Sequence, residues 1–346
     1  MSFTSTKKIA AAGTLTQAYV AGIRSKLFLL VALVLLLLII SILAILFGAY
    51  DISMEELFAI LNGKGSNVSR IVIINIRLTR VVAAIVCGWG LALSGLGLQS
   101  LLKNNLGSPF TMGLSQGASF GAALAVVMFN AKLMTITIYA FAGTLFTTLI
   151  ILSLAQMKRF SPEAIILAGV AISAFFHSAT IFMQYLANET DLAMIVFWTF
   201  GDVARSNWQQ NGLMAVVTLL ITFYFVRLRW DLNALLSGEE TAQGLGVNVE
   251  FLRFFGLIAL TLVVALATAF HGVIGFMGLI APHIARRMVG DDHRLLIPFT
   301  IIIGALLLLS ADTLGRLIIG SGALPVGVIT SFLGAPVFLY LLIRRL

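Results

Sequence analysis

Long apolar runs recur along the whole chain, and they constrain its fold more than any other feature. A run of about 18–25 apolar residues is long enough to cross the ~30 Å hydrocarbon core of a bilayer as a helix. Of the 346 residues, 60% are hydrophobic and 10% are charged, too few charges to cover a soluble domain of this size. The sequence therefore predicts an all-α polytopic membrane protein with about ten transmembrane helices, at residues 27–49, 78–102, 111–129, 133–155, 163–187, 211–228, 254–270, 272–288, 295–318 and 325–343.

The first run, "LFLLVALVLLLLIISILAILFGA", is too long for a signal-peptide core and has no cleavage pattern, so we expect it to be retained. We expect a cytoplasmic N-terminal segment at 1–26, followed by a single transmembrane domain at 27–346. The single cysteine, Cys87, lies in an apolar run and says little about redox compartment.

Basic residues predict the orientation of the chain. An even number of spans puts both termini on one side, and cytoplasmic loops are enriched in Lys and Arg. With both termini in the cytoplasm, about fifteen of the 22 basic residues fall inside: Lys7, Lys8, Arg24, Lys26, Lys103, Lys158, Arg159, Arg227, Arg229, Arg253, Arg286, Arg287, Arg294, Arg344 and Arg345. The net charge of +8 is explained by these loops, so we expect membrane lipid and no nucleic acid as a partner.

One polar segment, "LSGEETAQGLGVNVEFLR" at 236–253, interrupts the apolar pattern on the predicted cytoplasmic side. Glu239 and Glu240 suit the start of a helix, where acids complement the dipole. Gly244 and Gly246 then leave room for a turn between two short helices. Such a compact polar knob could fit a groove on a soluble partner, or it could be an ordinary amphipathic connector.

Glycines lie four residues apart in "MGLSQGASFGAA", at Gly113, Gly117 and Gly121, beside Ser115 and Ala118. Small residues at this spacing let helix backbones approach closely in lipid. We therefore interpret this face as a packing surface.

No motif supports an enzyme. "NGKGSN" at 62–67 lacks the spacing of a phosphate-binding loop, and neither a paired-histidine metal motif nor a nucleophile elbow is found. "GDDHR" at 290–294 is read as a helix cap in preference to a metal site. Secondary transport stays open as an alternative, although Asp312 is the only acid convincingly inside a run, and Arg316 follows it by one helical turn.

Several stretches together resemble the FecCD-type permeases, the membrane subunits of ATP-driven importers for iron–siderophores, haem and cobalamin. The stretches are, in order, "RLTRVVAAIVCGWGLALSGLGLQSLLKNNLGSP", "MGLSQGASFGAALA", "ILAGVAISA", "FWTFGDV", "GEETAQGLGVN", "GVIGFMGLIAPHIARRMVGDDHR" and "LPVGVITSFLGAPVFLYLL". They run from about Arg77 to Leu342, which is most of the chain. The glycine–proline–histidine stretch and the last stretch are the most specific.

The resemblance implies a type II ABC importer permease in the cell membrane of a prokaryote. Its expected partners are a second permease chain (identical or a close paralogue), two cytoplasmic ABC ATPases and an extracytoplasmic substrate-binding protein. No cofactor or metal is expected on this chain, because ATP–Mg would bind the ATPase. An iron–siderophore is the favoured substrate, with haem or cobalamin as other candidates, and the alternative is an ion-coupled secondary transporter that acts without an ATPase.

The resemblance also assigns roles at both ends of the spans. The polar segment would press into the ATPase through Gly238, Glu239, Glu240, Thr241, Ala242, Leu245 and Gly246. Charge reversal at Glu239 and Glu240, or a bulky residue at Gly244, is then expected to uncouple ATP hydrolysis from uptake without unfolding the spans. Arg77, Arg80 and Arg316 would dock the binding protein, with interfacial snorkelling as the simpler explanation. Thr79 stands where the family more often has proline.

The family's pathway would be lined largely by the fifth and tenth spans, with "FWTFGDV" near the outer mouth. This implies His177, Ser178, Met183, Gln184, Phe200, Thr330 and Ser331 as pathway residues, and Asn104, Leu106, Ser161 and Glu163 at a cytoplasmic gate. Core packing explains any one pathway residue equally well. Ala164 stands where the family often has an arginine, so this chain departs from the family's pattern at the gate. Pro282 and His283 are read as structural.

Overall fold

The computed structural model describes residues 3–47, 54–62, 66–129, 132–205, 207–319 and 324–343, and every regular element in these ranges is helical. The elements in order are α1 (Phe3–Leu46), α2 (Met54–Leu61), α3 (Asn67–Ile71), the π-helix η1 (Val72–Leu78), α4 (Thr79–Leu101), α5 (Leu114–Phe129), α6 (Leu133–Gln156), α7 (Pro162–Leu186), α8 (Glu189–Thr199), the 3-10 helix η2 (Val203–Arg205), α9 (Trp208–Arg227), α10 (Arg229–Leu236), α11 (Glu239–Gly244), α12 (Val249–His271), α13 (Met277–Val289), α14 (His293–Ile319) and α15 (Val326–Ile343).

Seven helical stretches in the described residues are long and apolar enough to cross a membrane: Val20–Leu46, Asn67–Leu101, Leu133–Gln156, Pro162–Leu186, Trp208–Arg227, Val249–His271 and His293–Ile318. Two shorter apolar helices, Leu114–Phe129 and Val326–Tyr340, match two more predicted spans. The remaining predicted span, 272–288, is shortened to α13, which has 13 residues. The all-helical membrane architecture is therefore confirmed, and three of the ten predicted spans are shorter than a full crossing.

Backbone geometry explains why α13 is short. Gly272 has φ +75° and Phe276 has φ +65°, so the chain leaves the helical conformation at both ends of 272–276. Left-handed backbone is easily adopted by glycine and rarely by phenylalanine. The predicted chain reversal between two spans near 269–275 is found. It extends to residue 276, so α13 begins at Met277 and the second span is shorter than predicted.

The first two spans begin earlier than predicted. α1 starts at Phe3, so helix runs through most of the segment predicted as a separate N-terminal piece; residues 48–49 of the first predicted span lie outside the described residues, as do Arg344 and Arg345. The second span starts at Asn67 and passes through η1 into α4. The helices α2, α3, α8 and α10 were not predicted, because each is short and lacks the long apolar run of a span.

The helix α4 forms the centre of the bundle. It packs against α9, α12, α13 and α14, and nearly all of its residues are buried. Glycines allow the closest approaches: a Cβ on Gly95 would lie 1.9 Å from the Gly278 carbonyl oxygen, and one on Gly88 would lie 2.4 Å from that of Gly304. α4 therefore fixes the positions of α13 and α14 by backbone contact.

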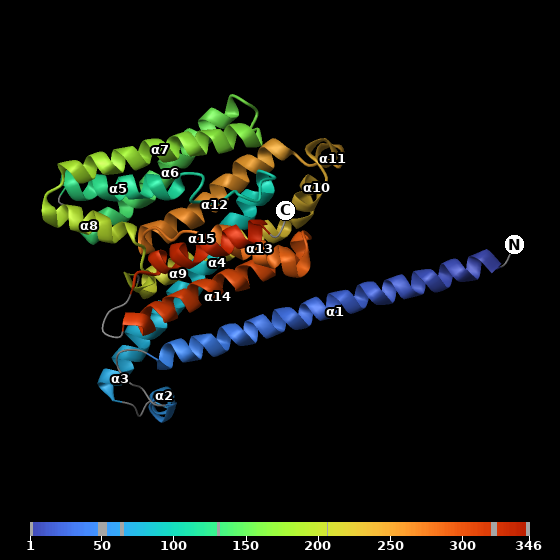
Figure 1. Cartoon of the computed structure of the whole chain (residues 1–346), viewed down its shortest axis with the longest axis horizontal. Helices are drawn as coiled ribbons and strands as arrows, with labels where there is room; N and C mark the ends of the chain where they lie inside the picture. Colours follow the sequence, from blue (N-terminus) through green and yellow to red (C-terminus); the bar gives the residue numbers. More distant parts are fainter. Residues whose placement is uncertain are drawn as a thin grey trace.

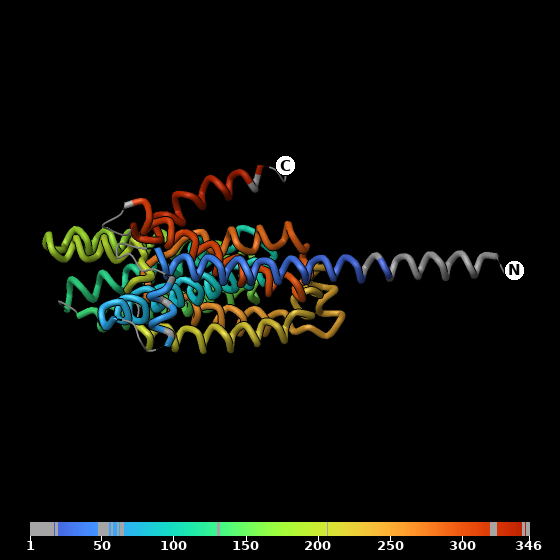
Figure 2. Tube along the Cα trace, turned by 90° about the horizontal axis from the view of Figure 1, so that it is seen from below, coloured from blue at the N-terminus to red at the C-terminus, as the bar shows by residue number. Residues whose placement is uncertain are grey.

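A second group of helices, α5 to α8, lies beside this centre (Figure 1). The predicted packing face of α5 is confirmed at two glycines, since Cβ atoms on Gly117 and Gly121 would meet the backbone of Gly143 and Tyr139 in α6. Gly113 instead precedes the helix, has φ +76° and packs against Ser173 in α7. α10 and α11 lie at one end of the bundle, and α8 lies at the other (Figure 1), while α15 runs along the outside (Figure 2).

Candidate functional site

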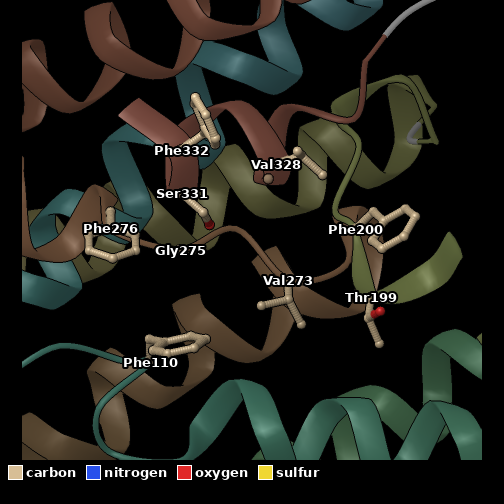
Figure 3. Close-up of a pocket in the computed structure, with 10 residues that line it drawn as sticks. Phe110, Thr199, Phe200, Val273, Gly275, Phe276, Val328, Ser331 and Phe332 are labelled. Carbon is tan, nitrogen blue, oxygen red and sulfur yellow. The ribbon is translucent and has the colours of Figure 1, made fainter. Parts of the chain in front are cut away.

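An aromatic cavity of about 490 Å³ opens where four segments meet. Phe110 comes from the segment between α4 and α5, Phe200 from the end of α8, Phe276 from the residues before α13 and Phe332 from α15 (Figure 3). The hydroxyl of Ser331 is directed toward the space between them (Figure 3). The other lining residues are Thr199, Val273, Gly275, Gly327 and Val328. The cavity is thus mainly apolar and has a few polar groups.

Two glycines bring three of these segments together. Gly201 has φ +66°, and its carbonyl accepts a hydrogen bond from the Gly327 amide at 3.1 Å. A Cβ on Gly327 would lie 2.2 Å from the Phe200 carbonyl oxygen and 2.5 Å from that of Val273. Only glycine therefore fits where α15 begins against the end of α8 and the 272–276 segment.

A second cavity, of about 290 Å³, shares Phe110, Thr199 and Val273 with the first. Its other lining residues come from α5 and α7: Ser115, Gln116, Ser119, His177, Thr180, Ile181 and Gln184. Among the described residues that line the two cavities, none is an acid, a lysine or an arginine. A solute in these cavities would meet aromatic rings, hydroxyls, amides and one imidazole.

The structure brings together part of the predicted pathway set. Phe200 and Ser331 line the aromatic cavity, and His177 and Gln184 line the second. Met183 is instead buried in an apolar cluster with Ile195 and Trp198.

Two further members of the predicted pathway set lie away from both cavities. Thr330 is buried, donates to the Gly327 carbonyl and lines a separate apolar cavity between α13, α14 and α15. Ser178 is exposed and lines neither cavity, because it lies on another side of α7 from His177.

Sequence reasoning missed Phe110, Val273, Phe276 and Phe332, and it covered Thr199 only as part of the segment "FWTFGDV". The only available signal was the glycine spacing in "GVIGFMG", which marks an irregular backbone next to an aromatic residue. Phe110 lies in a non-helical segment, and its position at the cavity depends on how that segment folds back.

The polar segment at 236–253 forms a compact folded unit at the other end of the bundle from α8 (Figure 1). α11 begins at Glu239, with Glu240 in its first turn, as predicted. The predicted turn after this helix is found, since α11 ends at Gly244 and Gly246, with φ +88°, lies between α11 and α12; the helix that follows is the long α12 and not a short one. A further break, at Gly238 with φ +126°, separates α11 from α10. Gly244 is the last residue of α11. Glycine is needed where the chain reverses, and α11 does not reverse at Gly244.

Within this segment, Leu245 is 70% exposed and Ala242 is fully buried. Thr241 and Glu240 are also exposed. The surface that α11 and its C-cap offer to a partner includes Glu240, Thr241 and Leu245, with Gln243 and Gly244 also exposed, while Ala242 packs into the interior of the unit.

Glu239 has a different environment from Glu240. Its carboxylate accepts two hydrogen bonds from the guanidinium of Arg253, at 3.1 and 2.8 Å, and Arg253 is fully buried. Removing one partner of a buried ion pair leaves an uncompensated charge. The expectation that charge reversal at Glu239 leaves the spans folded stays a prediction, and the pairing with the buried Arg253 argues against it for this residue.

Hydrogen bonds of Asn233 attach the neighbouring helix α10 to the start of α14. The Asn233 Oδ1 accepts from the His293 backbone amide at 2.9 Å, and its Nδ2 donates to Asp292 Oδ1 at 2.9 Å. The Arg294 guanidinium lowers the pKa of Asp292 to about 2, so this carboxylate stays ionised at physiological pH. Asp292 also accepts from the Arg294 amide at the start of α14, which is the capping role predicted for "GDDHR".

The predicted gate residues lie in two turns near α11. Asn104 Oδ1 accepts from the Leu106 amide at 2.9 Å, and Leu106 is 50% exposed. Ser161 caps α7 by accepting from the Ala164 amide, and Glu163 lies in the first turn of that helix. Both turns follow the last residues of long helices, α4 and α6.

The three predicted docking arginines form an arginine cluster with Asp202 and Asp312, near the α8 end of the bundle. Arg80 contacts Asp312 at 2.8 Å and Asp202 at 3.6 Å, and Arg316 lies 3.4 Å from Asp312, the predicted i,i+4 pair. Arg77 donates to the last carbonyls of α1, at Ile45 and Leu46. Cations suit a helix C-terminus, where carbonyls lack partners.

The cluster leaves little of each arginine exposed: 4% of Arg77 and 11% of the Arg80 and Arg316 side chains. Their guanidinium groups hold α1, α4 and α14 together at this end. Docking of a binding protein on these arginines stays a prediction. Asp312, fully buried and paired with two arginines, is already neutralised within the chain.

Comparisons with known proteins agree on one family. The model of the FecCD transport family matches residues 35–344. The chain is 45% identical over 341 residues to the "Putative ABC transporter permease protein MJ0087" of Methanocaldococcus jannaschii, which covers 95% of this chain and 97% of that protein. It is 36% identical over 272 residues to the vitamin B12 import system permease protein BtuC of Vibrio cholerae, covering 78% of this chain and 82% of the relative.

A solved structure described as "an inward-facing conformation of a putative metal-chelate type ABC transporter" superimposes with a TM-score of 0.83 at 32% identity. The match covers 91% of this chain and 99% of that one. The fold described above is thus shared with that solved structure over most of the chain.

Proposed function

This chain belongs to the FecCD transport family, and from that premise we propose that it carries an iron–siderophore into the cytoplasm, driven by ATP hydrolysis on a separate subunit. At the coarser level it is a multi-pass membrane permease of an ABC importer for metal chelates, and it is not the catalytic subunit. Haem and cobalamin are the other candidate substrates, since relatives are a hemin permease of Yersinia pestis and vitamin B12 permeases.

The polar segment is the proposed contact with the ATPase. Its two short helices form a folded unit with an exposed tip at Glu240, Thr241 and Leu245, and its base is tied to the ends of long helices by Glu239 and Asn233. This anchored unit is the observation that supports the proposal most directly. A tip that is hydrogen-bonded to the ends of long helices can pass its displacement on to those helices, whereas a flexible connector would absorb the displacement.

The two cavities are the proposed part of the translocation pathway within this chain. The lining residues that the structure describes include no acid, lysine or arginine, so a chelate would find no strong ionic partner among them. A pathway must hold its solute weakly enough to release it. A second permease chain, identical or paralogous, would complete the pathway, and a binding protein would deliver the solute at the α8 end.

The orientation is proposed from charge. The positive-inside rule places α10, α11 and both termini in the cytoplasm, where the ATPase would be. Cytoplasmic ATP–Mg would then bind only the partner subunit.

An ion-coupled carrier is the competing function. Such carriers need an ionisable group within the membrane that can gain and lose its ion. Asp312 is the acid that the apolar pattern singled out, and its pairing with Arg80 and Arg316 leaves it poorly suited to that role.

Reconstitution separates the two functions. The purified chain alone is compared with the chain plus its ATPase and binding protein in liposomes that contain Mg-ATP, with radiolabelled ferric siderophore as solute. We expect uptake only with the complete set and with ATP. Uptake by the chain alone under a proton or sodium gradient would overturn the proposal.

A second measurement identifies the substrate. Thermal shifts of the cognate binding protein with ferric siderophores, haem and cobalamin rank the candidates before any transport assay. Stabilisation by haem or cobalamin alone would overturn the siderophore assignment and leave the importer class intact.

A further inference from the structure

The buried guanidinium of Arg253 joins four separate parts of the chain at the α11 end of the bundle. Nε donates to the Leu101 carbonyl at 3.1 Å, and Nη1 donates to the Phe160 carbonyl at 3.2 Å. Nη1 and Nη2 also contact the carboxylate of Glu239. Arg253 itself belongs to the first turns of α12.

Arginine is a costly choice at this position. It is fully buried, and it lies near the N-terminal end of a helix, where the dipole disfavours a cation. Its planar fork of five N–H donors is spread over three nitrogens, so it reaches acceptors that lie farther apart than the three N–H donors on the one nitrogen of lysine can span. The side chain is therefore suited to linking the three acceptor groups.

Each backbone acceptor begins a segment that reaches the cavities. Leu101 is the last residue of α4, and the segment that follows carries Phe110, which lines both cavities. Phe160 precedes α7, which carries His177, Thr180 and Gln184 to the second cavity.

These two segments also touch each other. A Cβ on Gly113 would lie 3.0 Å from Ser173 Cα, and one on Gly169 would lie 3.2 Å from Met112 Cα. The walls of the second cavity are thus tightly packed.

The remaining acceptor, Glu239, lies on the helix with the fewest packing partners of the three acceptor segments. Glu239 is the first residue of α11, whose main packing partners are α10 and α12, so α11 has no broad contact of its own with α4 or α7. The Glu239 side chain is 40% exposed, whereas Arg253 is closed off from solvent. A displacement of α11 would therefore shift the Arg253 side chain, and through its hydrogen bonds to Leu101 and Phe160 it would shift the starts of both cavity segments.

We propose that Arg253 is the positioning residue that transmits movement of α11 to the cavity walls, by holding Glu239, Leu101 and Phe160 on one guanidinium. The proposal rests on the proposed function, in which α11 receives the push of an ATPase. Energetic coupling between distant sites is carried by packed and hydrogen-bonded groups, and a change at one such residue alters it by roughly two- to thirtyfold.

The first test measures coupling in the complete complex in liposomes. Arg253→Lys keeps the positive charge but removes the guanidinium with its N–H donors on three nitrogens. Glu239→Gln keeps a side chain of similar shape but removes the negative charge. The matched controls are Arg287→Lys and Glu250→Gln, exposed residues on the neighbouring helices α13 and α12. We expect both Arg253→Lys and Glu239→Gln to retain ATP hydrolysis while uptake per ATP falls roughly two- to thirtyfold, with the controls unchanged.

A merely structural role would give a different result. It would lower hydrolysis, uptake and complex yield together, leaving uptake per ATP unchanged, and that outcome would overturn the proposal.

The second test needs no transport. Spin labels on Leu245→Cys and Leu106→Cys, both exposed, report the distance between α11 and the segment after α4, because the native Cys87 is buried. We expect one narrow distance distribution in the otherwise unchanged purified chain and a broadened one with Arg253→Lys. A narrow distribution in that variant would overturn the link even if the chain proved to be a different kind of transporter. Absence of ATP-driven uptake by the unmodified complex would instead overturn the proposed function.

Discussion

Glu239 and Glu240 are adjacent acids at the start of one short helix, yet their surroundings differ completely. Glu239 neutralises the buried Arg253, and Glu240 is exposed at the tip. Composition and helix-dipole arguments treat the two alike, since both suit a first turn. Only the contact with a residue 14 positions later separates them.

Reversing these two charges separately is expected to give different results. Glu239→Lys leaves the buried Arg253 facing a like charge and should lower the free energy of unfolding by roughly 1–3 kcal/mol, since Glu239 itself is 40% exposed. Glu240→Lys should change it by less than about 0.5 kcal/mol, as exposed substitutions usually do. Thermal unfolding of the purified variants in detergent measures both, and equal midpoints would contradict the buried pair.

Asp312 gives a second prediction at the same scale. Asp312→Asn removes the charge that offsets Arg80 and Arg316, and breaking a buried pair of this kind costs roughly 3–5 kcal/mol. The midpoint of thermal unfolding should fall, while the exposed Glu189→Gln should leave it unchanged. If Asp312→Asn unfolded like the unmodified chain, Asp312 would be free for another role, and the ion-coupled function would gain support.

Helices in this chain are held at close range by glycine pairs. α4 meets α14 at Gly88 and Gly304, and it meets α13 at Gly95 and Gly278. In a bilayer, burial of apolar side chains supplies little drive for helix association, so close backbone packing matters more. The central position of α4 follows from these contacts.

A single methyl group tests this packing. Gly95→Ala would place a Cβ 1.9 Å from the Gly278 carbonyl oxygen, so α4 and α13 must separate. Overpacking of this kind costs roughly 1–3 kcal/mol, which should appear as a lower unfolding midpoint. The matched control is Gly212→Ala in α9, where nothing lies within 4 Å, and it should be neutral or slightly stabilising. The reverse order of the two variants would contradict the model of α4 packing.

The two ends of the molecule have different chemistry. The end with α10 and α11 carries the anchored polar segment, and the end with α8 carries the arginine cluster (Figure 1). Their assignment to the two sides of the membrane rests on the distribution of basic residues.

Labelling tests that assignment. In intact cells, a membrane-impermeant maleimide should label Glu189→Cys in α8 and should label Leu245→Cys only after the membrane is opened. Both positions are exposed, and the buried Cys87 should not react. Labelling of Leu245→Cys from outside would reverse the orientation and remove the proposed contact with a cytoplasmic ATPase.

The sequence by itself determined the helical membrane architecture, the position of the polar segment and the start of α11. These features depend on local information: a bilayer accepts only helices or closed barrels, and an apolar run of sufficient length predicts the former. The glycine face on Gly117 and Gly121 was also predictable, because its spacing is that of a helix.

Only the tertiary structure decided which residues meet. Phe200, Phe276 and Phe332 are far apart in sequence and converge because glycines at 201 and 327 allow their segments to touch, and Phe110 joins them from the separate segment between α4 and α5. The pattern of "VNVEFLR" likewise gives no sign that Arg253 is fully buried against Leu101, Phe160 and Glu239. Contacts of this kind depend on the path of the whole backbone, which no local period or propensity encodes.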